Sequence, residues 1–153
     1  MMQPESPENV NVCDLVNALR ALQTALDQRD AAISAAHQMA RSDWRCLQWL
    51  RDNGPQSPSA IRHALGLTSG SVTALLDRME ARGLVERCAD PRDRRALRIA
   101  LCDAATDLLD RTDAPLAQVA DKLAVRWGTE RMLAAERACL DLAKLVAWVA
   151  VKG

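Results

Sequence analysis

The apolar pattern of the chain changes its period at Gly83, and this change constrains the fold more than any other feature. Before Gly83, apolar residues recur at three- and four-residue spacing, which predicts one buried face of a helix: Val72, Leu75, Leu76 and Met79. After Gly83 the pattern alternates, first from Leu84 to about Cys88 and then over residues 96–101. There Leu97, Ile99 and Leu101 are expected to point inward and Arg98 outward. Because the two strands flank residues 89–95, we predict a hairpin directly after the helix.

A second short helix is predicted just before this one. Ser57 followed by Pro58 is typical of an N-cap and a first helical residue, and Gly66 is typical of a helix end. After the brief turn Leu67-Thr68, Ser69 is expected to cap the next helix, which stops at Gly83. Two short helices joined through a Gly-containing turn form a helix-turn-helix.

Longer helices are expected on the N-terminal side of this segment. Residues 1–9 contain Pro and Glu without apolar periodicity, which predicts a disordered leader. Apolar residues then follow helical spacing from Val12 to about Ala40. A further helix is predicted to be capped by Ser42 or Asp43 and to end at Asn53-Gly54-Pro55.

Helical spacing resumes beyond Cys102. One or two helices are expected to reach Gly128, with Pro115 kinking or dividing them and Thr112 or Asp113 capping the second part. A last helix is predicted to start at Thr129. The expected fold is therefore mainly α with a small two-stranded β wing.

The charge of the chain is concentrated in its centre. The net charge is +0, yet residues 43–101 carry ten Lys and Arg against seven Asp and Glu. Five arginines cluster around the predicted hairpin: Arg87, Arg92, Arg94, Arg95 and Arg98. Arginines at an exposed tip behind a helix-turn-helix indicate a winged helix that faces the phosphates of DNA.

Composition excludes several other classes of protein. The N-terminus lacks the pattern of a signal peptide and no apolar stretch is long enough to span a bilayer, so we expect a cytoplasmic protein without a membrane partner. The five cysteines are scattered without a CxxC pair, and buried, reduced thiols are the expectation. His37 and His63 are isolated, so neither a metal nor a cofactor is predicted.

The sequence from about Asn53 to Leu101 resembles the winged-helix core of the multiple-antibiotic-resistance regulator (MarR) family. The stretches LTSGSVTALLDRMEARGLVER and DPRDRRALRIAL carry the likeness, with the family pattern at residues 75–87 and 90–95. The flanking helices agree in number and position. The resemblance implies a winged helix-turn-helix DNA-binding domain at residues 43–101 and dimerisation helices at 10–42 and 102–153.

The resemblance also implies roles for individual residues. Arg95 would lie at the wing tip toward the minor groove, oriented by Asp93 through a salt bridge, while Arg92 and Arg94 supply charge to phosphates. Three hydroxyl residues match the start of the recognition helix, where they would meet phosphates or base edges: Ser69, Ser71 and Thr73. Arg78 matches a position that contacts the DNA backbone or braces the wing.

Taken together, these features predict a homodimeric, sequence-specific transcriptional regulator, a repressor on a pseudo-palindromic operator, and not an enzyme. In the family, a small ligand or stress signal changes DNA affinity, and the candidate ligand-binding residues here are Trp44, Trp49 and Trp127. Core packing is the alternative role for these tryptophans.

Two alternative functions remain open. The face of the recognition helix opposite its buried side is small and acidic, with Gly70, Ala74, Asp77 and Ala81, which favours a protein-interaction module with degenerate DNA binding. Cys13 lies near the start of the first helix, where it resembles the reactive Cys of peroxide-sensing relatives, and this favours a thiol-based redox-sensing regulator. Those relatives depend on partner Tyr hydroxyls, and this chain has no Tyr. Asp14 also has the wrong charge to activate a neighbouring thiol. A thiol-dependent enzyme built on Cys13 or Cys46 lacks a base nearby in the sequence.

Overall fold

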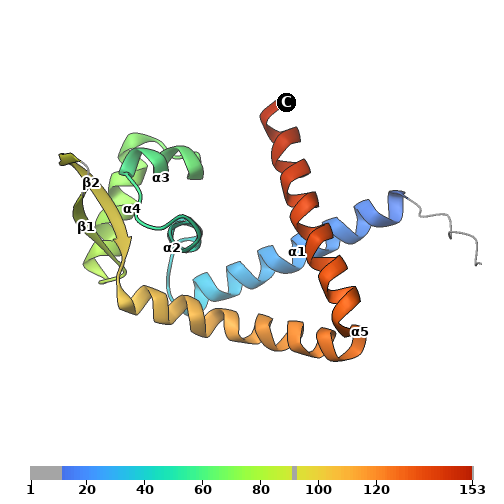
Figure 1. Cartoon of the computed structure of the whole chain (residues 1–153). Helices are drawn as coiled ribbons and strands as arrows, with labels where there is room; N and C mark the ends of the chain where they lie inside the picture. Colours follow the sequence, from blue (N-terminus) through green and yellow to red (C-terminus); the bar gives the residue numbers. More distant parts are fainter. Residues whose placement is uncertain (1–11, 91–92, 153) are drawn as a thin grey trace, which may run out of the picture. The chain divides into compact units, whose positions relative to one another are not determined.

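The computed structural model describes residues 12–90 and 93–152, and for Val12, Arg94, Arg95 and residues 147–152 it describes the backbone only. The chain divides into two compact units, residues 1–107 and 108–153. The elements in order, labelled in Figure 1, are α1 (Val12–Ala36), α2 (Arg41–Asn53), α3 (Pro58–Leu65), α4 (Ser69–Ala81), β1 (Val85–Asp90), β2 (Asp93–Leu101) and α5 (Asp103–Lys152). This is the predicted class: mainly helical with one two-stranded antiparallel sheet.

The core of the first unit lies among α2, α3, α4 and the base of the sheet. All four predicted residues of the inward face of α4 are buried. They pack in the same core as apolar residues of the neighbouring elements: Trp44, Leu47, Leu50, Ile61, Val85 and Ile99. Burial of each large apolar side chain stabilises the fold by about 1.5–3 kcal/mol, so this core fixes α3 and α4 as a helix-turn-helix.

The predicted limits of α3 are confirmed. The side chain of Ser57 accepts a hydrogen bond from the backbone N–H of Ala60 at 3.1 Å, Pro58 is the first helical residue, and Gly66 ends the helix with φ 65°. A left-handed φ favours glycine because it has no Cβ. The cap of α4 differs by one residue: Thr68, not Ser69, accepts from the N–H of Ser71.

The predicted cap of α2 is wrong. The helix starts at Arg41, and Ala40 precedes it without a side-chain cap. Asp43 lies inside the helix and is buried, and Ser42 donates a hydrogen bond to it. Local sequence favoured a capping carboxylate here, but a distant partner holds this carboxylate instead.

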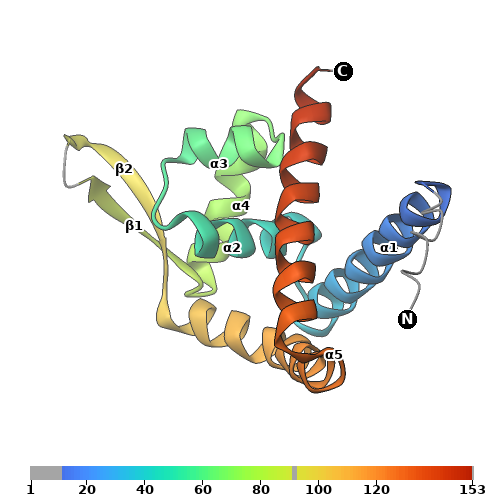
Figure 2. The same ribbon diagram turned by 45° about the vertical axis from the view of Figure 1, so that its right-hand side comes forward.

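The strands β1 and β2 form an antiparallel hairpin that projects from the helices (Figure 2). Ile99, at its base, is fully buried, and its backbone pairs with that of Gln56. Leu97 was expected to point into the core, but it is 52% exposed. The strand alternation is correct, yet Leu97 lies farther along the wing, where no core remains to cover it.

The first helix and the last one differ from expectation at their ends. α1 ends at Ala36, not near Ala40, and the following turn contains Gln38 at φ 50°. α5 runs through Pro115 without division, so no new cap forms at Thr112 or Asp113. The predicted break at Gly128 is confirmed by φ 74° and ψ 168° at that residue.

Both helices expose large apolar side chains. On α1 these are Leu15, Val16, Leu22 and Leu26. In the second unit they are Leu116, Val119, Val125, Trp127, Leu133, Leu140, Leu145 and Val146. Within the described residues, no helix is long and apolar enough to cross a membrane.

Candidate nucleic-acid interface

The N-terminus of α4 is an exposed, hydroxyl-rich surface. Ser69, Ser71 and Thr73 are all exposed, as the sequence predicted. Two of the hydroxyls are already ordered, because the Ser71 hydroxyl lies 2.7 Å from that of Thr68 and the Thr73 hydroxyl donates to the carbonyl of Ser69 at 3.0 Å. The first N–H groups of a helix and its dipole favour an anion at this end.

A shallow hollow of about 400 Å³ adjoins this helix end. It is lined from α3 and α4 by Pro58, Ser59, Arg62, Ser69, Val72 and Thr73. Ser59 and Arg62 were not among the predicted site residues. Their signal is the three-residue spacing that places both on one side of α3, next to the turn. Arg62 adds a cation beside the hydroxyl cluster, and its Nη2 lies 2.8 Å from Nε2 of His63.

The outward row of α4, the exposed face opposite its buried side, carries mostly short side chains. Gly70, Ala74, Asp77 and Ala81 are exposed, which confirms the predicted direction of this face. Only Asp77 among them has a polar side chain. The face is therefore small at its start and acidic at its end.

The acidic end of α4 is paired with the wing. Arg87 on β1 donates to Oδ1 of Asp77 at 2.6 Å and also to Oε2 of Glu80. Hydrogen bonding to Asp77, together with the charges of both carboxylates, raises the pKa of the Arg87 guanidinium against a smaller opposing effect of burial. One of the five clustered arginines is thus held by the recognition helix itself.

A second arginine of the cluster is held inside the wing. Arg98 donates from Nε to Asp90 at 2.7 Å and from Nη1 to the carbonyl of Pro55 at 3.3 Å. Of the remaining three, Arg94 and Arg95 lie on β2 with only their backbone described, and Arg92 is outside the described residues. Asp93 is exposed at the start of β2. The proposed orientation of Arg95 by Asp93 stays a prediction.

The guanidinium of Arg78 is held by a buried carboxylate of α2. Its Nη2 donates to Oδ1 of Asp43 at 2.7 Å, and Asp43 is buried while Arg78 is about half exposed. Hydrogen bonding to Asp43, reinforced by its charge, raises the pKa of the guanidinium. One edge of the guanidinium is therefore oriented by α2, and the side chain still reaches the surface.

The three tryptophans named as candidate ligand-binding residues lie on two helices, α2 and α5. Trp44 is 1% exposed, Trp49 is half-buried on the same helix, and Trp127 lies in the second unit beside Gly128. Trp44 does line a cavity of about 60 Å³ with Asp27, Asp30, Arg41 and Arg45. Its buried Nε1 has no hydrogen-bond partner.

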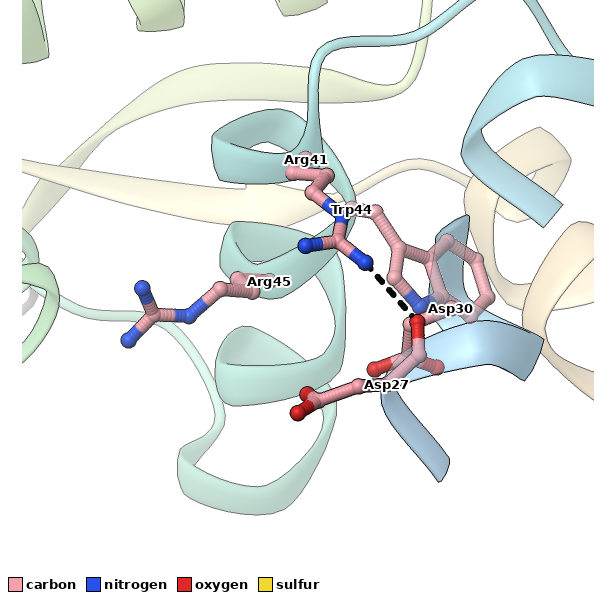
Figure 3. A pocket seen from close by; sticks show the side chains of 5 residues that line it. All are labelled: Asp27, Asp30, Arg41, Trp44 and Arg45. Atoms are coloured by element: carbon pink, nitrogen blue, oxygen red, sulfur yellow. Dashed lines mark hydrogen bonds between the residues drawn. The ribbon is translucent and has the colours of Figure 1, made fainter. Parts of the chain in front are cut away.

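The charged walls of this cavity come from α1 and α2. Arg41 reaches toward α1 and donates to the carbonyl of Asp27 at 2.9 Å, whereas Arg45 is directed away (Figure 3). Asp30 accepts from Gln48 at 3.5 Å. The lining therefore combines a guanidinium, two carboxylates and a donor that has no partner among the described residues.

The thiols are more varied than predicted. Cys46 is buried, and desolvation with a contribution from Asp43 raises its pKa to about 12. Cys102 and Cys88 are partly exposed, and the expectation of burial is wrong for Cys13 and Cys139, which are exposed on helices. Within residues 12–90 and 93–152, no three His, Cys, Asp or Glu side chains gather as a metal site.

The helix-turn-helix, the hairpin behind it and the hydroxyl-rich start of α4 define a winged helix-turn-helix protein. Residues 37–96 match the model of the MarR family. Over this segment the chain is similar to the MarR family.

Relatives agree with this assignment. The HTH-type transcriptional regulator YsmB of Bacillus subtilis is 32% identical over 91 residues, 60% of this chain and 62% of the relative. Among solved structures, a MarR family protein of Bacillus stearothermophilus has a TM-score of 0.73 at 22% identity, over 93% of this chain and 99% of that one. A MepR variant of S. aureus bound to an oligodeoxyribonucleotide has a TM-score of 0.58 at 18% identity, over 88% and 97%. The chain spans about a third to three fifths of the curated relatives it matches.

Proposed function

We propose that the chain is a homodimeric, sequence-specific DNA-binding transcriptional regulator that represses from a pseudo-palindromic operator in the cytoplasm. The observation that carries the proposal is the exposed, hydroxyl-rich N-terminus of α4, beside Arg62 and ahead of a two-stranded wing. A helix of this kind enters the major groove, and a wing reaches along the backbone or into the minor groove. No catalytic step belongs to this function.

The proposed DNA contacts divide by chemistry. Ser69, Ser71 and Thr73 meet phosphates or base edges at the start of α4. Arg78 meets the backbone with the part of its guanidinium that Asp43 leaves at the surface. At the wing, Arg92 and Arg94 supply charge to phosphates, and Arg95, oriented by Asp93, enters the minor groove.

The exposed apolar side chains of α1 and α5 support a dimer. A second copy of the same surfaces is the partner that would bury them, because soluble proteins rarely expose so many neighbouring apolar side chains. Twofold symmetry would set two α4 helices on half-sites about one helical turn apart, or about 34–36 Å.

The cavity at Trp44 is the proposed effector site. A small polar ligand would accept a hydrogen bond from Nε1 of Trp44 and compete for Arg41, which now bridges α2 to the carbonyl of Asp27. Loosening this bridge would shift α1 relative to α2 and change the separation of the two recognition helices.

A fluorescence titration against DNA at two salt concentrations tests the function. About six to eight phosphate contacts in the dimer predict a slope of log K against log salt of about −5 to −7. Duplexes recovered from sheared genomic DNA should bind at least about a thousandfold more tightly than random duplexes.

The second candidate function is a protein-interaction module. It is favoured by the outward row of α4, in which Gly70 and Ala74 offer no hydrogen-bonding side chain to a base. A salt slope near zero would select this function over DNA binding.

A further inference from the structure

Arg87 on β1 pairs with two carboxylates of α4 and so reduces the negative charge of that helix. Asp77 and Glu80 are spaced three residues apart, lie on one side of the helix and are 59% and 41% exposed at their side chains. Both are bound by the single guanidinium of Arg87, which is 30% exposed and comes from β1. The wing strand thus delivers one cation to two carboxylates of the recognition helix.

Carboxylates on this helix oppose the proposed function. Asp77 stands in the same outward row as Gly70 and Ala74, which have nothing long enough to hold a phosphate away from it. Like charges brought together without a counterion weaken association strongly, and the duplex carries one negative charge per about 1.7 Å of its axis. Without Arg87, the helix would present two uncompensated negative charges.

The geometry points to Arg87 as a positioning residue that masks the acidic end of α4, so that α4 can approach DNA. This inference rests on the proposed function. Nη1 and Nη2 of Arg87 each donate to one of these carboxylates, so we assign Arg87 an indirect role on DNA and not that of a phosphate contact. Its effect on DNA is exerted through Asp77 and Glu80.

A cycle of charge variants tests the inference. Arg87→Ala should weaken binding to one fixed duplex about tenfold at low salt. Adding Asp77→Asn and Glu80→Gln to Arg87→Ala should restore affinity to within about threefold of the parent, because the repelling charges are gone although no ion pair is rebuilt. Asp77→Asn with Glu80→Gln alone should bind at least as tightly as the parent, since Arg87 is then released.

A matched control uses a second ion pair of the wing, Arg98 with Asp90. Arg98 and Asp90 are paired at 2.7 Å but neither lies on α4. Adding Asp90→Asn to Arg98→Ala should therefore restore nothing. Thermal melting of every variant establishes that each is folded at the temperature of the titration.

The outcomes separate the inference from the function. If the triple variant binds as weakly as Arg87→Ala, then Arg87 contacts phosphate or acts only through the fold, and the inference is overturned while DNA binding stands. If the parent protein binds DNA with no salt dependence, the proposed function fails and the inference fails with it.

Discussion

Nη2 of Arg78 lies 2.7 Å from Oδ1 of Asp43, and this contact joins the recognition helix to the first turn of α2. One helical turn later, Arg82 donates to the carbonyls of His37 at 2.8 Å and Gln38 at 3.0 Å. Arg78 on α4 thus contacts the first turn of α2, and Arg82 at the C-cap of α4 contacts the turn between α1 and α2. A displacement at the α1–α2 turn would be transmitted to α4 through these two contacts.

Replacing Asp43 should weaken the fold modestly. In Asp43→Ala the guanidinium of Arg78 loses its buried partner, but half of that side chain is already solvated, so we expect a loss of about 1 kcal/mol in the free energy of unfolding. Urea denaturation measures it. Asp52→Ala is the control, because Asp52 lies on the same helix with a 69% exposed side chain and should change the free energy by no more than about 0.5 kcal/mol.

The turn after α1 predicts a stabilising glycine. Gln38 has a φ of 50°, a left-handed conformation in which a Cβ is unfavourable. Gln38→Gly should raise the free energy of unfolding by about 0.5–1 kcal/mol. Gln28→Gly, at an exposed position within α1, should lower it by about the same amount, because glycine disfavours a helix interior. Equal signs for the two variants would contradict this account.

Sequence patterns over a few residues correctly predicted the features of the fold that depend only on neighbouring residues. The buried face of α4, the Ser57-Pro58 start of α3 and the break at Gly128 follow from periodicity, capping and left-handed φ, which a short stretch of sequence contains. The predicted capping role of Asp43 was wrong because its carboxylate binds Arg78, which is 35 residues away, and no local pattern identifies such a pair. The predicted burial of Leu97 was wrong because the alternation of apolar residues identifies the face of a strand but not how far the core extends beneath that face.

The candidate site, like the fold, was predicted only in part. The hydroxyls at the start of α4 were identified from sequence, whereas the pairing of Arg87 with Asp77 and Glu80 was not. The sequence presents these residues as a basic cluster and an acidic helix face, and only their spatial arrangement shows that they neutralise each other. Pro115 was expected to kink or divide the helix, and α5 runs through it without division, because proline removes one backbone hydrogen bond while the neighbouring residues still favour the helix.

Cys46 should resist alkylation and make the fold sensitive to alkali. Its pKa of about 12 lies well above the ordinary 9.0, so at pH 8 it should react at least about a hundredfold more slowly than exposed Cys139. The contribution of this raised pKa to stability is complete below pH 9 and is lost as the pH rises toward 12. Mass spectrometry after timed alkylation locates each thiol, and fast labelling of Cys46 in the native protein would contradict its burial.

A change of stability with pH checks the same group. Over the alkaline range, the free energy of unfolding of Cys46→Ala should fall less steeply with pH than that of the parent. Cys139→Ala, at an exposed position, should keep the parent's slope.

The wing tip should contribute to affinity more than its base. Arg95→Ala is expected to weaken DNA binding by about 1–3 kcal/mol, the range for one groove contact. Arg98→Ala should weaken it less, because Arg98 is already engaged by Asp90 and the carbonyl of Pro55. A titration of each variant with the same duplex compares them, and equal losses would contradict a specific role for the tip.

The exposed apolar stripe of α1 predicts a variant that separates assembly from folding. Leu22 is 52% exposed and lies on a stripe with Leu15 and Leu26, so Leu22→Glu should leave the helix intact but oppose burial against a second copy. Sedimentation should show the parent as a dimer and Leu22→Glu as a monomer, with DNA affinity lowered at least about a hundredfold because the second half-site is no longer bound in the same complex. Leu97→Glu is the control, since Leu97 is equally exposed but lies on the wing and should leave the dimer unchanged. A parent protein that sediments as a monomer would contradict the assignment of this stripe to assembly.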